Sequence, residues 1–177
     1  MSDFFLTTVL TFDASVRICV PLIFASMAGL FAERSGVVDI GLEGKLLMSA
    51  FIAASAASVF GSPWLGLIAG MFASSVLAMI HGFASITYKG NQIVSGVAIN
   101  ILASGLTMIL TLAWFKRGGI TPTLQNDERF LSITLPGVDI IDHIPIIGVI
   151  YRELISGHNI LVYLAFVIVP IVWWVVY

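Results

Sequence analysis

The chain has 177 residues, of which 59% are hydrophobic and 10% are charged, and its mean hydropathy is +1.05. Soluble domains carry about 25% charged residues, so this composition excludes an ordinary soluble domain and a disordered chain. The formal net charge of −2 leaves no polybasic surface for nucleic acid. The single cysteine, Cys19, excludes a disulfide framework. These values indicate an integral membrane protein.

The first membrane span is expected over residues 14–32. Its only charged residue is Arg17, which lies close to the expected start, where a long side chain can reach the interface. Pro21 is expected in the first turns of this helix. Residues 1–12 contain no basic side chain, so the N-terminus does not resemble a cleavable signal.

Charge-free runs predict the remaining spans. The run 46–88 is too long for one crossing of about 20 residues, and Gly61, Ser62 and Pro63 divide it. Further spans are therefore expected over 42–60, 64–86, 92–115 and 159–177. Together with 14–32, they predict an all-α, polytopic transmembrane helical bundle of about five spans in a single domain, 1–177.

The segment 116–158 has a different composition, because charged residues recur along it. They are Lys116, Arg117, Asp127, Glu128, Arg129, Asp139, Asp142, Arg152 and Glu153. We expect this segment to lie in water.

Small and polar residues recur at helical spacing within the predicted spans. Small-residue rows that predict close helix packing are Gly66, Gly70, Ser74, Ala78 and Gly82, and Ala50, Ala54 and Ser58. A polar stripe comprises Gln92, Gly96, Asn100, Ser104, Thr107 and Thr111. The stripe has two interpretations, interhelical hydrogen bonding or a polar wall along a solute path.

Residues 33–45 form the densest polar feature, with five charged residues and three glycines between two apolar helices. One interpretation is a charged turn with local ion pairs. The other is a broken helix that faces a ligand or ion, as in transporters. Enzyme motifs are missing from the sequence: Leu46 follows Gly44 and Lys45, which does not fit a Walker A loop, and the histidine spacing fits no metal site.

Two stretches of the sequence resemble the signature of a known family. They are residues 30–44, LFAERSGVVDIGLEG, and residues 90–100, GNQIVSGVAIN. They resemble ABC transporter permeases of the branched-chain amino acid, ribose and nucleoside group, most closely the nucleoside (simple sugar) importers. Asp39 stands where that family usually has asparagine. The resemblance covers essentially the whole chain.

The resemblance implies a multi-pass subunit of the bacterial cytoplasmic (inner) membrane that forms a translocation pathway with a second permease. It also implies a cytoplasmic ABC ATPase, an extracytoplasmic solute-binding (lipo)protein, and a nucleoside or simple sugar as the solute. ATP hydrolysis would reside on the partner, so this chain is expected to be no enzyme and to carry no cofactor. The expected pathway or motif residues are Asp39, Glu43, Gln92, Asn100 and Ser104.

The family continues beyond its next helix into a cytoplasmic loop that docks on the ATPase. We therefore expect 1–177 to be a permease domain that is incomplete at its C-terminus. The alternative is a truncated, non-transporting membrane assembly protein.

The family orientation makes the segment 116–158 extracytoplasmic, whereas the distribution of basic residues favours the opposite orientation. The family orientation places inside Arg34, Lys45 and Lys89, and outside Arg17, Lys116, Arg117, Arg129 and Arg152. Both orientations remain open at the level of sequence.

Overall fold

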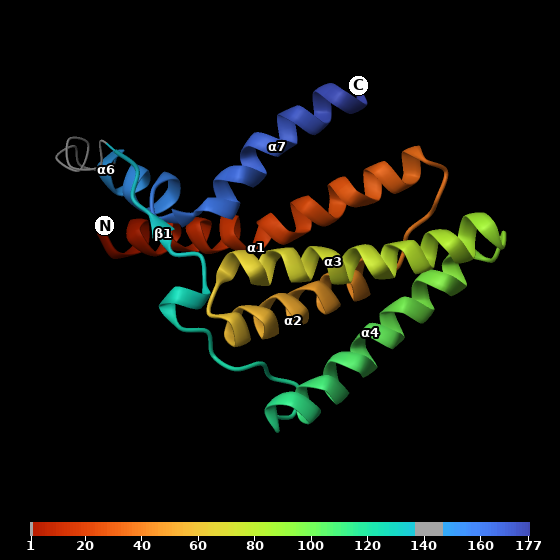
Figure 1. Ribbon diagram of the computed structural model, residues 1–177. Helices are drawn as coiled ribbons and strands as arrows, with labels where there is room; N and C mark the ends of the chain where they lie inside the picture. Colours follow the sequence, from red (N-terminus) through yellow and green to blue (C-terminus); the bar gives the residue numbers. More distant parts are fainter. Residues whose placement is uncertain (1, 137–146) are drawn as a thin grey trace. The chain divides into compact units, whose positions relative to one another are not determined.

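The computed structural model describes residues 2–136 and 147–177, and its elements are almost all helical (Figure 1). In chain order they are α1 (Ser2–Arg34), α2 (Leu42–Phe60), α3 (Pro63–Gly82), η1 (Phe83–Thr87), α4 (Gln92–Phe115), η2 (Asn126–Glu128), β1 (Ser132–Ile133), α6 (Ile147–Ile150), η3 (Tyr151–Ile155), β2 (His158–Asn159) and α7 (Ile160–Val176). The prediction of an all-α polytopic bundle is confirmed.

Four helices in the described part of the chain are long and apolar enough to cross a membrane. They cover Phe4–Arg34, Leu42–Phe60, Pro63–Thr87 and Gln92–Phe115. The fifth predicted span corresponds to α7, an apolar helix of 17 residues, at the short end of the range that can cross a bilayer.

The first helix begins much earlier than predicted, at Ser2 rather than at residue 14. Hydroxyl groups in the added turns bond the carbonyl one turn back, as from Thr8 to Phe4 (2.8 Å) and from Thr11 to Thr7 (2.7 Å), so they do not break the helix. Pro21 consequently lies inside α1 and not in its first turns.

The contacts divide the chain into two compact units, which we describe separately. Unit 1 comprises Met1–Met27 and Phe130–Tyr177, and unit 2 comprises Ala28–Arg129. The predicted aqueous segment, 116–158, contributes to both units, and its residues 137–146 lie outside the described part of the chain.

In unit 1, α7 packs on the middle of α1 through a small apolar core of Val20, Val162 and Ala165. The strand pair β1–β2 is antiparallel and precedes α7. Asp13 of α1 lies 3.5 Å from the buried His158 and 3.1 Å from Arg17. Arg17 was expected near the start of the helix. It instead lies well inside α1, where its partner is the carboxylate one turn back.

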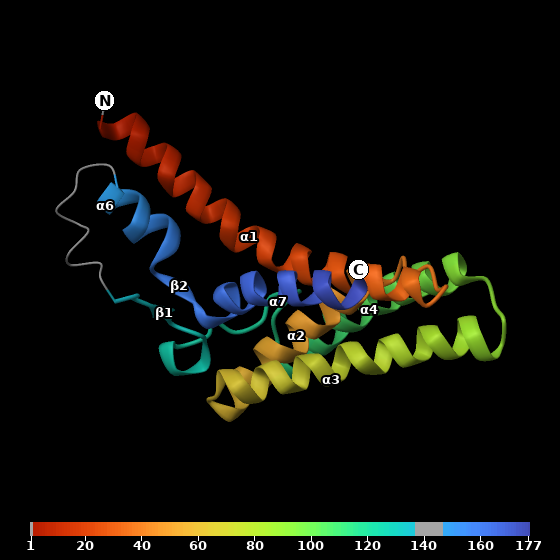
Figure 2. The same ribbon diagram turned by 90° about the horizontal axis from the view of Figure 1, so that it is seen from above.

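In unit 2, α2 and α3 form an antiparallel hairpin around Gly61, whose φ of +62° suits glycine. The two helices run side by side in both views (Figures 1 and 2). A core joins α2, α3 and α4, and its buried members are Met48, Phe51, Leu77, Ile99 and Ala103.

Two glycines allow α3 to lie directly on α2. A Cβ on Gly66 would lie 2.6 Å from the carbonyl oxygen of Ala53, and one on Gly70 would lie 2.8 Å from that of Ser49. The predicted row on α3 thus makes close contacts at these two positions, whereas Gly82 faces open space. On α2 these contacts fall on Ser49, Ala53 and Ala57, one position before the predicted row of Ala50, Ala54 and Ser58.

Replacing Gly70 by alanine should destabilise unit 2 by about 1–3 kcal/mol, because the added methyl group collides with the α2 backbone. Gly82→Ala, on the same helix, is the matched control, since a methyl group at that position would have no neighbour within 4 Å. The measurement is SDS-induced unfolding of the full chain in mixed micelles. Equal stabilities of the two variants would show that the close approach is absent.

Candidate functional site

The candidate site is the loop between α1 and α2, residues 35–41, together with the helix faces that contact it. Gly36 has a φ of +81°, a conformation that glycine adopts without strain. The amides of Ser35, Gly36 and Val37 bond carbonyls of the last turn of α1. The helical path is therefore interrupted here, and it resumes at Leu42.

An ion pair inside this break joins Asp39 to Lys45. The two side chains are 10% and 5% exposed, so the pair is largely shielded from solvent. One carboxylate oxygen of Asp39 accepts from Lys45 Nζ, and the other accepts from the amide of Gly41 at 3.1 Å. The negative charge of Asp39 is thus neutralised by Lys45 at the start of α2, and the Gly41 amide in the same loop also binds it.

His81 of α3 packs against the same loop and is 2% exposed. Its Nε2 lies 3.3 Å from the carbonyl oxygen of Val38 and 3.9 Å from Asp39, and its Nδ1 lies 3.0 Å from Ser95 Oγ. Because a carbonyl can only accept, Nε2 donates to Val38, and Nδ1 lies within hydrogen-bond distance of the Ser95 hydroxyl. Both ring nitrogens therefore have a polar partner.

Two side chains of α4 bind the backbone of the break. Gln92 Oε1 accepts from the amide of Val38 at 2.7 Å. Asn100, two helical turns further along, accepts from the amide of Gly44 at 2.8 Å through Oδ1 and donates to the carbonyl of Ile40 at 3.1 Å through Nδ2. The residue before α2, Gly41, offers no side-chain cap, so Asn100 supplies from another helix the acceptor that a helix start requires.

Glycines on both sides allow these hydrogen bonds to form. A Cβ on Gly96 would lie 2.9 Å from the amide nitrogen of Gly41, and one on Gly44 would lie 2.8 Å from Asn100. The two sequence motifs, 30–44 and 90–100, therefore meet in space at backbone distance.

The structure brings three of the five predicted site residues together: Asp39, Gln92 and Asn100. Glu43 lies on the first turn of α2 and is exposed, with no side-chain partner among the described residues. Ser104 is also exposed, and its hydroxyl bonds the carbonyl of Ile101 in its own helix. A role of any of the five in contacting solute stays a prediction.

Sequence reasoning did not include Lys45, His81 or Ser95 in the site. A signal for His81 existed, since it is the one imidazole in the charge-free run 46–88 and a polar group at membrane depth needs a partner. Within the described ranges no group of three His, Cys, Asp or Glu side chains is arranged to hold a metal ion; His143 lies outside those ranges.

The helices define a multi-pass membrane protein, and its two sequence motifs meet at the loop between α1 and α2. Residues 12–177 match the family described as branched-chain amino acid transport system / permease component. The chain belongs to this family, and with its membrane-length helices it is a protein of the cytoplasmic (inner) membrane.

Curated relatives include three transporter permeases. The guanosine ABC transporter permease protein NupQ of Bacillus subtilis is 38% identical over 144 residues, which are 78% of this chain and 43% of NupQ. The nucleoside ABC transporter permease protein NupC of Lactococcus lactis is 31% identical over 89% of this chain and 48% of NupC. TsgC13 of Haloferax volcanii, an ABC transporter permease protein with a provisional assignment to glucose, is 31% identical over 93% of this chain and 47% of TsgC13.

The chain spans about half the length of these curated relatives. No solved structure matches it significantly.

Removing one partner of the Asp39–Lys45 pair should destabilise unit 2 by about 3–5 kcal/mol, because it leaves a buried charge uncompensated. Asp39→Asn is the first variant and Lys45→Met the second. The double variant should recover most of the loss, since neither charge then remains. SDS-induced unfolding of all four proteins gives the coupling free energy. Additive losses in the double variant would contradict a direct pair.

Proposed function

We propose that the chain is a membrane permease subunit of an ATP-driven ABC importer for nucleosides or related simple sugars. The observation that carries the proposal is its relation to two named nucleoside-class permeases across most of its length. In this proposal it forms the translocation pathway with a second permease subunit, in the lipid bilayer. A cytoplasmic ABC ATPase binds and hydrolyses ATP, an extracytoplasmic solute-binding (lipo)protein delivers the solute, and this chain carries no cofactor.

We assign the five site residues to two roles, positioning of the loop and contact with solute. Asp39, Gln92 and Asn100 form hydrogen bonds with the loop backbone, with the start of α2 and with Lys45, so we assign them to positioning. Glu43 and Ser104 are exposed on neighbouring helices that also meet at Gly44 and Asn100. We assign these two to contact with solute or with the remaining pathway wall.

The test is uptake of radiolabelled guanosine and ribose by cells that express the chain with its native neighbouring genes. The proposal predicts energy-dependent uptake that is lost when the gene is deleted and restored when it is returned, and co-purification with an ABC ATPase. Stable insertion in the membrane without any effect on uptake would instead support the non-transporting assembly protein.

Within the same assay, Glu43→Gln should lower uptake on the order of tenfold, a loss of about 1.4 kcal/mol, while membrane insertion is unchanged. Uptake should fall because the proposal assigns this carboxylate to the solute pathway. Insertion should not change, because the exposed carboxylate at the start of α2 makes no internal contact in the described structure that the substitution could disturb. Glu128→Gln is the matched control, because an amide oxygen can still accept from the Gln125 backbone. Unchanged uptake in Glu43→Gln would remove this residue from the pathway.

A further inference from the structure

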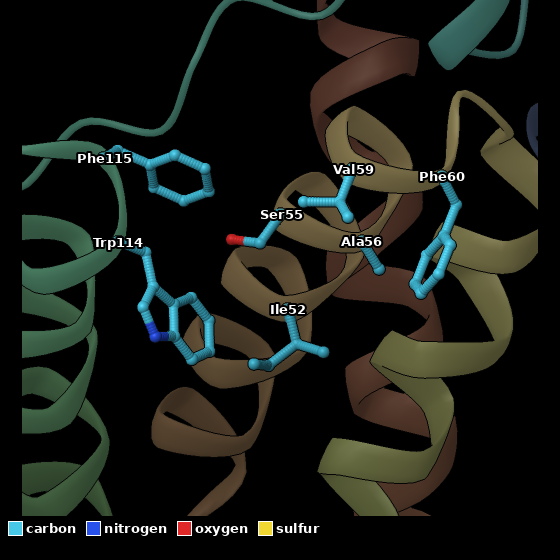
Figure 3. Close-up of a pocket in the computed structure, with 7 residues that line it drawn as sticks. All are labelled: Ile52, Ser55, Ala56, Val59, Phe60, Trp114 and Phe115. Carbon is cyan, nitrogen blue, oxygen red and sulfur yellow. The ribbon is translucent and has the colours of Figure 1, made fainter.

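An open apolar groove of about 280 Å³ lies between the second half of α2 and the end of α4 (Figure 3). Its walls are almost entirely hydrocarbon, with Trp114 stacked on Phe51 at 5.8 Å between ring centres. The lining residues are Ile52, Ser55, Ala56, Val59, Phe60, Trp114 and Phe115. The only hydroxyl among them, on Ser55, is buried and has no hydrogen-bond partner in the described structure.

The groove lies at a membrane boundary. Both of its walls belong to helices of membrane-spanning length, and it is lined by the last residues of each, Phe60 on α2 and Phe115 on α4. Trp114 is at the same level, where tryptophan is enriched in membrane proteins. The interior of the groove therefore faces hydrocarbon and its rim faces the headgroup region.

Two cationic residues directly follow Phe115, which lines the groove. Lys116 and Arg117 are exposed and form no ion pair among the described residues. Lys116 caps α4 in the left-handed conformation. Among the next charged residues along the chain, Glu128 binds the Gln125 backbone and Arg129 binds Asn126, while Asp127 is exposed.

We propose that this groove binds an anionic phospholipid, with one acyl chain along Ile52, Val59 and Trp114 and the phosphate beside Lys116 and Arg117. Charge complementarity at the rim carries the choice of occupant, because an apolar segment of another protein would leave both cations unmatched. The lining agrees with this choice, since the walls of the groove offer almost no polar partner for a nucleoside. The inference is independent of the transport function.

Brominated lipids test the proposal, because bromine quenches tryptophan only at short range. The protein is the full chain with Trp64, Trp173 and Trp174 replaced by phenylalanine, so that Trp114 alone reports. It is reconstituted in phosphatidylcholine vesicles that contain increasing fractions of either phosphatidylglycerol or phosphatidylcholine with brominated acyl chains. The proposal predicts that phosphatidylglycerol quenches at fractions on the order of tenfold lower than phosphatidylcholine.

In the same vesicles, Lys116→Gln and Arg117→Gln should each lower this preference about threefold, and Arg129→Gln is the matched control that should leave it intact. Ala56→Phe places a large side chain in the groove and leaves both cations unchanged. With this variant, quenching of Trp114 by either lipid should fall to the level expected from random contact with bulk lipid. Equal quenching by the two lipids, or a preference that survives both cation variants, would overturn the proposal. Absence of quenching by either lipid would show that protein covers the groove, which also overturns it.

Discussion

The structure of unit 2 depends on one constraint: the backbone groups left without helical partners where the helical path breaks between α1 and α2 need other hydrogen-bond partners. Side chains from two other helices meet this need. Gln92 and Asn100 of α4 bind the amides of Val38 and Gly44, and His81 of α3 lies against the Val38 carbonyl. Unpaired backbone groups in this break would cost free energy. Their hydrogen bonds to side chains of α3 and α4 offset that cost and join the loop to the packed helices.

The residue types of both motifs follow from this arrangement. Glycine is required at positions 44 and 96 because the backbones approach too closely for a side chain. An amide side chain suits position 100, because it must accept from one backbone group and donate to another at the same time. Asp39 stands where the nucleoside (simple sugar) importers usually have asparagine. Its negative charge balances the positive charge of the buried Lys45. Packing of the loop against α4 therefore explains the residue types at these motif positions. The exposed positions next to them remain free to contact solute.

Charge-free runs predicted the helices well, since α2 and α4 have the bounds that the sequence indicated. The start of α1 was predicted at residue 14, whereas Asp13 and the threonines before it lie within the helix, where the hydroxyls of Thr8 and Thr11 bond backbone carbonyls and Asp13 lies beside His158. One interpretation of residues 33–45 was a charged turn with local ion pairs, and the pair of Asp39 and Lys45 is such a contact. The role of His81 escaped prediction, because it depends on how the loop lies against a distant helix, which periodicity along one helix does not report.

The central claim is that the loop 35–41 and the start of α2 are held by α4 side chains. Hydrogen–deuterium exchange of the full chain in lipid nanodiscs measures this directly at the amides of Val38 and Gly44. The account predicts that both exchange as slowly as the middle of α2, and that Asn100→Ala accelerates exchange at Gly44 while Ser104→Ala, at an exposed position of the same helix, leaves it unchanged. Fast exchange at Gly44 in the unaltered protein, or no response to Asn100→Ala, would contradict it.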